Sequence, residues 1–203
     1  MRWWLRETPD ATAIEVDGEA LSFFELHHWS GRIAQALLDE GIRTGDFVTM
    51  IGVNSLEYAV LIVALVRIGV IGAPLTFRSS APDIIEAVDS FNPKAIYCDT
   101  ERFAMVETVL AASAAPVQIR NFTSLRALRN GPAASPDVEL DRDAPLFIIN
   151  TSGSTAKSKA VVSTNFAVMT YACEFLIMEP SCGRGAKILS LCPSSEHLAL
   201  MAA

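Results

Sequence analysis

The chain has 203 residues, of which 51% are hydrophobic and 19% charged, so it can bury a core and is not intrinsically disordered. Sixteen basic and 23 acidic residues give a net charge of −7, which argues against binding to nucleic acid or to an anionic lipid surface. The sequence shows neither a membrane-spanning run nor a signal-peptide pattern, so we expect a cytoplasmic protein with no membrane span and with reduced cysteines.

The N-terminal residues predict a short hairpin around the turn dipeptide Asp17-Gly18. Ser22 and Glu25 then form a capping-box pattern, which predicts the start of a helix over about residues 23–40. Two adjacent histidines inside this helix have no second set of metal ligands near them in sequence. We expect them to be surface or packing residues.

Between residues 47 and 130, short apolar strands alternate with helices of ten to fifteen residues. This alternation predicts an α/β fold with a largely parallel sheet covered by helices. The expected strands are 47–51, 70–74, 95–98 and 117–119, and the expected helices are 55–68, 81–90, 101–112 and 124–130.

A connector rich in proline, alanine and glycine, residues 130–143, divides the chain into an α/β portion, 1–129, and a second portion, 144–203. The second portion begins with a fully apolar strand, and a hydroxyl-rich loop follows that strand directly. The elements expected there are strands over 145–149, 160–163 and 186–191 and a helix from residue 164 or 165 to 178.

The loop between the first two of these strands has a composition suited to an anion. It combines five hydroxyl residues with one glycine and two lysines, in the run Thr151, Ser152, Gly153, Ser154, Thr155, Lys157, Ser158 and Lys159. Backbone amides, hydroxyls and ammonium groups together can replace the water around phosphate oxygens. The Walker pattern is not met, since Ser158 stands where the second glycine belongs. On composition alone, a solvated turn remains an alternative.

The run Thr151-Ser-Gly-Ser-Thr-Ala-Lys-Ser-Lys-Ala-Val-Val resembles the phosphate-loop signature of the adenylate-forming superfamily, T-S-G-[ST]-T-G-x-P-K-G-V. This superfamily comprises the AMP-forming acyl-CoA synthetases, luciferases and peptide-synthetase adenylation domains. Residues 41–48, 64–74 and 190–197 are also similar to the family, so the resemblance covers nearly the whole chain. Three signature positions differ, because Ala156, Ser158 and Ala160 replace glycine, proline and glycine.

The resemblance implies that the chain is the first part of the large N-terminal domain of an adenylate-forming enzyme. In that family ATP, accompanied by Mg²⁺, reacts with a small-molecule carboxylic acid to give an acyl adenylate, and a thiol, commonly coenzyme A, then accepts the acyl group. The resemblance places Thr151, Ser152, Gly153, Ser154 and Thr155 around the β- and γ-phosphates and Lys159 as the closing cation. It places His197 in the acyl pocket. The alternative is that His197 has a structural role and forms a hydrogen bond with a backbone carbonyl at the start of a helix.

Family members are considerably longer, and their C-terminal lid domain, with its catalytic lysine, has no counterpart in this sequence. We therefore expect the parent protein to be an acid–thiol ligase for a fatty or other apolar carboxylic acid, and the chain alone to be inactive. The first alternative is a non-catalytic scaffold fragment with at most weak nucleotide binding. The second is a flavodoxin-like module that binds its ligand at a switch point of the sheet. The high hydrophobic content also predicts self-association through segments after residue 164.

Overall fold

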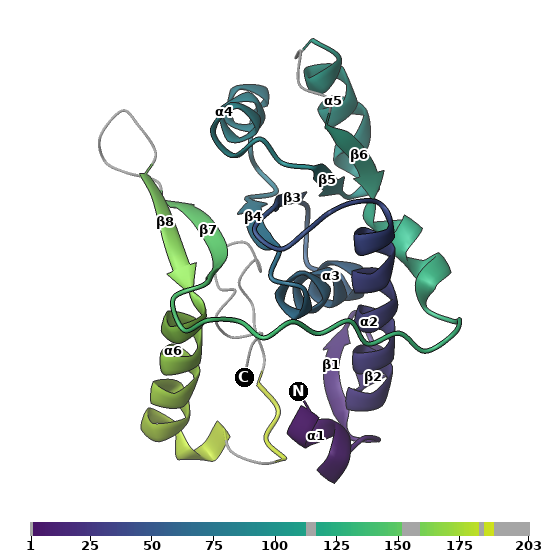
Figure 1. Cartoon of the computed structure of the whole chain (residues 1–203), viewed down its shortest axis with the longest axis vertical. Coiled ribbons are helices and arrows are strands. Elements are labelled where there is room, and N and C mark those ends of the chain that lie inside the picture. Colours follow the sequence, from purple (N-terminus) through teal and green to yellow (C-terminus); the bar gives the residue numbers. More distant parts are fainter. Residues whose placement is uncertain (1, 113–116, 152–158, 183–184, 189–203) are drawn as a thin grey trace.

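The structure, a computed structural model, describes residues 2–112, 117–151, 159–182 and 185–188. These residues form a six-stranded sheet in the order β6-β5-β3-β4-β7-β8 and a separate two-stranded sheet, β1-β2 (Figure 1). The strands are β1 (Thr12–Val16), β2 (Glu19–Ser22), β3 (Phe47–Ile51), β4 (Ile71–Leu75), β5 (Ala95–Cys98), β6 (Gln118–Asn121), β7 (Pro145–Thr151) and β8 (Lys159–Thr164). The α-helices are α1 (Arg2–Glu7), α2 (Phe23–Asp39), α3 (Leu56–Arg67), α4 (Ala81–Phe91), α5 (Thr100–Ala111) and α6 (Asn165–Met178), and the 3₁₀-helices are η1 (Phe122–Leu128) and η2 (Pro180–Cys182).

The large sheet is parallel except at one edge. Strand β3 pairs in parallel with β4 and β5, β5 with β6, and β4 with β7, whereas β8 runs antiparallel to β7. The predicted α/β class with a largely parallel sheet is therefore confirmed. The carboxyl ends of β3, β4, β5 and β7 consequently lie at the same edge of the sheet.

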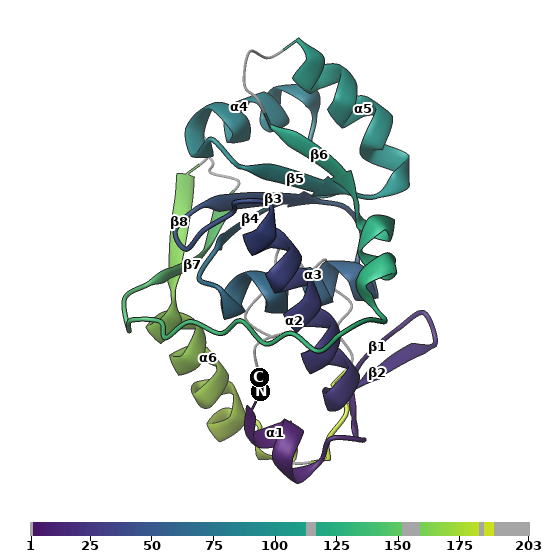
Figure 2. The same cartoon turned by 45° about the vertical axis from the view of Figure 1, so that its right-hand side comes forward.

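Helices cover both faces of the sheet. Helices α2 and α3 lie on one face, and α4 and α5 lie on the other (Figure 2). Strand β3 contributes to both cores: Val48 and Met50 belong to the cluster with α2 and α3, and Ile51 belongs to the cluster with α4 and α5. This division follows from the strand geometry, because successive side chains point to opposite faces.

The predicted helix start at residue 22 is confirmed. The Ser22 hydroxyl accepts a hydrogen bond from the Glu25 amide at 3.1 Å, and the Glu25 carboxylate accepts one from the Ser22 amide at 2.8 Å. Each contact satisfies a backbone donor that has no partner within the first turn. The Thr164 hydroxyl caps α6 in the same way by accepting from the Ala167 amide at 3.2 Å.

The connector between η1 and β7 has no regular secondary structure, and it crosses α2 in both views (Figures 1 and 2). Arg67, at the end of α3, holds it in place: its Nε donates to Asp137 and its Nη2 to the Ser135 hydroxyl, both at 2.7 Å. The same guanidinium also donates to the His27 carbonyl at 2.6 Å, so it joins the connector to α2. A buried guanidinium requires partners of this kind, because its charge has lost its hydration.

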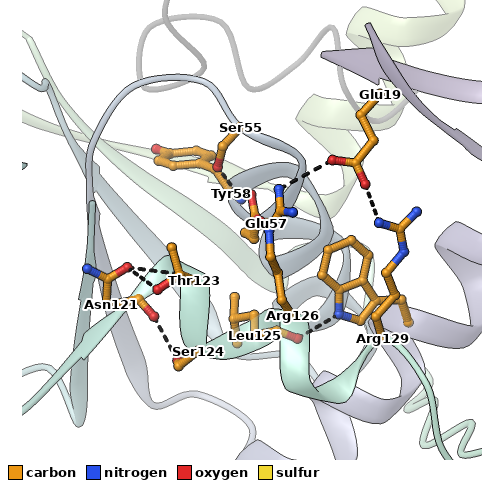
Figure 3. A network of polar contacts seen from close by, with 11 residues as sticks. Glu19, Ser55, Glu57, Tyr58, Asn121, Thr123, Ser124, Leu125, Arg126 and Arg129 are labelled. Carbon is orange, nitrogen blue, oxygen red and sulfur yellow. Dashed lines mark hydrogen bonds and ion pairs between the residues drawn. The ribbon is translucent and has the colours of Figure 1, made fainter. Parts of the chain in front are cut away.

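A second polar network ties the small sheet to the body of the domain (Figure 3). Arg126 of η1 pairs with the buried Glu57 of α3 and with Glu19 of β2, and Arg129 also pairs with Glu19. The Trp29 indole of α2 donates to the Leu125 carbonyl at 2.9 Å. The short η1 segment is therefore anchored to three other elements.

Two predicted elements differ in the structure. The helix expected over 124–130 is the 3₁₀-helix η1, which begins earlier because the Asn121 side chain accepts from the Thr123 amide at 2.9 Å. The strand expected over 186–191 is not formed by residues 186–188, and the rest of that range lies outside the described residues. Among the helices that the structure describes, all are too short or too polar to cross a lipid bilayer.

Candidate functional site

The hydroxyl-rich loop connects the two strands of the β7–β8 hairpin. Thr151 ends β7, Lys159 begins β8, and these two positions are paired in the antiparallel register. Phe147 pairs with Gly72 of β4, and Thr151 lies four residues further along β7. The loop therefore leaves the sheet at the edge where the carboxyl ends of the parallel strands meet, and in α/β proteins this edge binds ligands.

Close packing between β4 and β7 places the hairpin there. Leu146 and Phe147 of β7 are buried, with 3% and 2% of their surfaces exposed. A Cβ atom at Gly72 would lie 2.9 Å from Cδ1 of Phe147, so only glycine allows the ring to pack at this point. Gly72 therefore helps to fix the position of the β7–β8 hairpin and its loop.

Only two of the predicted site residues belong to the described part of the chain. The backbone of Thr151 and Lys159 lies at the two strand ends, whereas the sequence predicts strands over 145–149 and 160–163 with both residues in the loop. The remaining predicted residues are outside the described part of the chain: Ser152, Gly153, Ser154, Thr155 and His197. Their roles in phosphate and acyl binding stay predictions.

The loops after β3 and β5 contact each other at the same carboxyl edge of the sheet. Asp99 follows β5 and accepts from the amide of Arg102 at 3.0 Å and from the amide of Val53, in the loop after β3, at 3.2 Å. A Cβ atom at Gly52 would lie 2.9 Å from the Asp99 carboxylate, so the close approach of these loops requires a glycine. One carboxylate therefore caps α5 and also fixes a neighbouring loop.

Arg102 extends this connection to the loop after β4. Its guanidinium pairs with Asp99, and its Nε donates to the Phe77 carbonyl at 2.6 Å. The Phe77 ring also lies 5.3 Å from the Arg102 guanidinium and 5.0 Å from that of Arg78, which is exposed. Sequence reasoning missed this cluster. The available signal was an aspartate immediately after a buried strand, in a helix-capping position.

Neither thiolate chemistry nor a metal cluster is supported at this edge. Burial raises the pKa of the Cys98 thiol to about 12, with Asp99 adding to the shift, so the thiol is protonated at neutral pH. Within the described ranges, no group of three or more histidine, cysteine or carboxylate side chains could hold a metal ion. The polar groups described at this edge are therefore the Asp99–Arg102 pair and the exposed Arg78.

The same edge contains the topological switch point. Helix α3, which links β3 to β4, lies on one face, and α4, which links β4 to β5, lies on the other (Figure 2). The connections diverge between the carboxyl ends of β3 and β5, because α3 leads from β3 toward β4 on one face and α5 leads from β5 toward β6 on the other. The phosphate-loop hypothesis and the binding-module alternative therefore predict ligands at different points of one edge.

Comparison with known proteins identifies the class. The family described as "AMP-binding enzyme" matches residues 1–202, and the chain belongs to this family. The chain is 28% identical to a feruloyl-CoA synthase from Amycolatopsis over 195 residues, which cover 96% of this chain and 38% of that protein. It is 30% identical to a 2-succinylbenzoate–CoA ligase from Bacillus cereus over 167 residues, 79% of this chain and 32% of that protein.

The fold agrees with this assignment. The crystal structure of ATP-bound MatB from Rhodopseudomonas palustris superimposes with a TM-score of 0.83 at 24% identity, covering 96% of this chain and 40% of that one. The chain therefore has the fold of part of an adenylate-forming enzyme. It spans about two fifths or less of the length of these relatives.

Proposed function

We propose that the chain is the triphosphate-binding part of an ATP-dependent, AMP-forming acid–CoA ligase. The observation that carries the proposal is the position of the β7–β8 hairpin, whose hydroxyl- and lysine-rich loop starts at the carboxyl edge of the sheet. Family membership and the CoA ligases among the relatives support the same reaction class.

The donor set of the loop suits a triphosphate. Hydroxyls of Thr151, Ser152, Ser154 and Thr155 and the backbone amide of Gly153 would donate to the β- and γ-phosphate oxygens, and the Lys159 ammonium group would neutralise part of their charge. Charge stabilisation matters here because pyrophosphate leaves when a carboxylate attacks the α-phosphorus. Mg²⁺ would accompany ATP and neutralise further charge.

The acid and the acceptor are assigned by likeness to the relatives. One relative is named a feruloyl-CoA synthase and the other a 2-succinylbenzoate–CoA ligase, and both names specify an aromatic acyl group and CoA. We propose a carboxylic acid with a substantial apolar part as the substrate, coenzyme A as the thiol, and His197 as a residue lining the acyl pocket. We further propose that the 203-residue chain binds ATP without turning it over.

A direct titration with ATP and Mg²⁺, followed by calorimetry, tests the phosphate site. Lys159→Met removes the proposed closing cation and should weaken ATP binding at least tenfold. Lys94→Met is the matched control, because Lys94 is exposed and precedes β5 at the opposite edge of the sheet. Equal affinities of the two variants would contradict the proposed role of the loop. Absence of ATP binding by the unaltered chain would favour the non-catalytic scaffold.

A further inference from the structure

A surface cavity of about 410 Å³ lies between α2 and the start of the connector. Side chains from the first part of α2 form one wall, and residues of the segment 129–133 form the other. Both views show the segment that leads from η1 into the connector on the side of the domain away from β8 and α6 (Figures 1 and 2). The volume of the cavity is that of a small-molecule site, roughly 300–1,000 Å³.

Three side chains form a stripe along the α2 wall. Phe24, His28 and Arg32 are four residues apart, so they lie on one face of the helix at successive turns. The ring centres of Phe24 and His28 are 4.2 Å apart, and Phe24 is 50% exposed. The same face continues with Gln35 and Asp39, whose side chains are hydrogen-bonded at 2.9 Å. Such a polar face is typical of a helix in contact with water.

Arg32 has no carboxylate partner in the described part of the chain. Its Nε donates to the Leu128 carbonyl at 2.8 Å, and its Nη2 donates to the Arg129 carbonyl. The other described arginines that are buried or half-buried each form an ion pair with a carboxylate: Arg67, Arg102, Arg120 and Arg129. Arg32 is therefore the exception among them.

The two carbonyl contacts of Arg32 leave one edge of its guanidinium available. A guanidinium carries five N–H donors, and the contacts to Leu128 and Arg129 use the edge formed by Nε and Nη2. The edge formed by Nη1 and Nη2 can bind a carboxylate through two parallel hydrogen bonds. Burial lowers the pKa of Arg32, and a bound anion would oppose this effect by stabilising the charged guanidinium.

The other charged groups of the cavity favour a ligand with a single negative charge. Arg129 also lines the cavity, but its charge is balanced by an ion pair with Glu19 (Figure 3). Glu25 lies at the aromatic end of the stripe, seven positions before Arg32, which is about 10 Å along the helix axis. A second negative charge at that end of the ligand would be repelled by the Glu25 carboxylate.

We propose that this cavity binds a small organic monoanion, whose carboxylate pairs with the Nη1–Nη2 edge of Arg32 and whose planar apolar body lies along His28 and Phe24. The stripe from Phe24 to Arg32 spans eight residues, or about 12 Å along the axis, which accommodates a two-ring carboxylate. Aromatic side chains favour flat partners of this kind. The site is separate from the proposed ATP site, because the two sites have no residue in common.

Titration of the chain with 2-naphthoate, followed by calorimetry, tests the proposal. One molecule of 2-naphthoate should bind per chain. 2-Naphthamide has the same shape and no charge, and it should bind about tenfold more weakly because it cannot form the charge-assisted pair with Arg32. Inorganic phosphate lacks the planar body and should also bind more weakly than 2-naphthoate.

Two variants locate the site. Arg32→Met should weaken 2-naphthoate binding about tenfold, because it removes both donors to the carboxylate. Phe24→Ala should weaken it about threefold and leaves the contacts of Arg32 with η1 in place. Arg43→Met is the matched control, because Arg43 is an exposed arginine near the other end of α2 and also donates to backbone carbonyls. It should leave the affinity unchanged.

Two further measurements separate this proposal from the proposed function. ATP affinity should be the same in Arg32→Met and in the unaltered chain, and 2-naphthoate should slow hydrogen exchange in peptides that span residues 24–32 and 129–133. Absence of 2-naphthoate binding, equally tight binding of 2-naphthamide or phosphate, full affinity in both Arg32→Met and Phe24→Ala, or protection confined to other segments would each overturn the proposal. None of these results would bear on the ATP site.

Discussion

Arg67 at the end of α3 binds Asp137 of the connector at 2.7 Å, although the two residues are 70 positions apart in sequence. The Arg67 side chain is 7% exposed and that of Asp137 is 23% exposed. The ion pair therefore joins a buried guanidinium to the segment that leads from η1 to β7. Through it, the position of the connector depends on the packing of α2 and α3.

Replacing Arg67 with methionine should destabilise the protein by about 3 kcal/mol, because it leaves the carbonyl and hydroxyl groups that now accept its hydrogen bonds without a donor. Urea unfolding followed by circular dichroism measures the change. Arg78→Met is the control, since Arg78 is exposed and its loss should cost much less. Similar losses in both variants would show that Arg67 does not hold the connector.

Gly31→Ala should also destabilise, by about 1–3 kcal/mol, because the new Cβ atom would lie 2.0 Å from the Ala134 carbonyl oxygen of the connector. Helix propensity alone predicts the opposite sign, since alanine stabilises a helix interior relative to glycine by about 1 kcal/mol. The sign of the change in unfolding free energy separates the two effects. A stabilised variant would mean that the connector does not pack on α2 as described.

Lowering the pH should reduce the free energy of unfolding, because His27 is buried in the neutral form beside Arg67. Burial lowers the pKa of His27 below its ordinary value of 6.5, and the charge of Arg67 lowers it further, while Asp137 partly opposes this shift. The folded state therefore favours the neutral imidazole. The neutral imidazole of His27 contributes its full stabilisation above pH 6.5, the pKa in the unfolded chain. This stabilisation is lost as the pH falls below 6.5 and through the lower pKa of the folded state.

Unfolding free energies measured between pH 7.5 and 5 should thus fall more steeply for the unaltered chain than for His27→Gln. The control is Gln118→Ala, because Gln118 is exposed on β6 and carries no titratable group, so its replacement should leave the slope in place. If His27→Gln retained the full pH dependence, another group would be responsible.

The proposed phosphate loop differs from the signature that it resembles at Ala156, and this difference suggests a variant with tighter binding. Where a loop needs a positive φ angle, alanine costs on the order of 1 kcal/mol relative to glycine. Ala156→Gly should therefore tighten ATP binding roughly fivefold, which corresponds to about 1 kcal/mol. Ala133→Gly, in the exposed part of the connector, should leave the affinity unchanged. Weaker binding by Ala156→Gly would contradict the expected loop conformation.

Local patterns were sufficient to predict much of the fold. The capping contacts between Ser22 and Glu25 join residues three positions apart, so the sequence displays both partners together. The alternation of strands and helices in residues 47–112 was also predictable, because the hydrophobic pattern within each segment reflects which of its residues are buried. The apolar run over 145–149 likewise predicted a buried strand directly before the hydroxyl-rich loop, although the strand of the structure continues to Thr151.

Contacts between distant residues were not predictable in this way. The pairing of Arg67 with Asp137, and the contact of Asp99 with the loop after β3, depend on how whole elements pack. The reversal of β8 relative to β7 also escaped the periodicity argument, since an apolar strand has the same pattern in a parallel or an antiparallel pair. The earlier start of η1 follows from its N-cap residue Asn121, which lies three residues before the segment expected to be helical.

Hydrogen exchange with and without ATP and Mg²⁺ tests the central claim most directly, because it reports which backbone amides the nucleotide protects. The account predicts slower exchange in peptides that span residues 150–160, and loss of this protection in Lys159→Met. Protection confined to the loops after β3, β4 and β5, with no change in 150–160, would contradict the assignment of the β7–β8 loop as the triphosphate site.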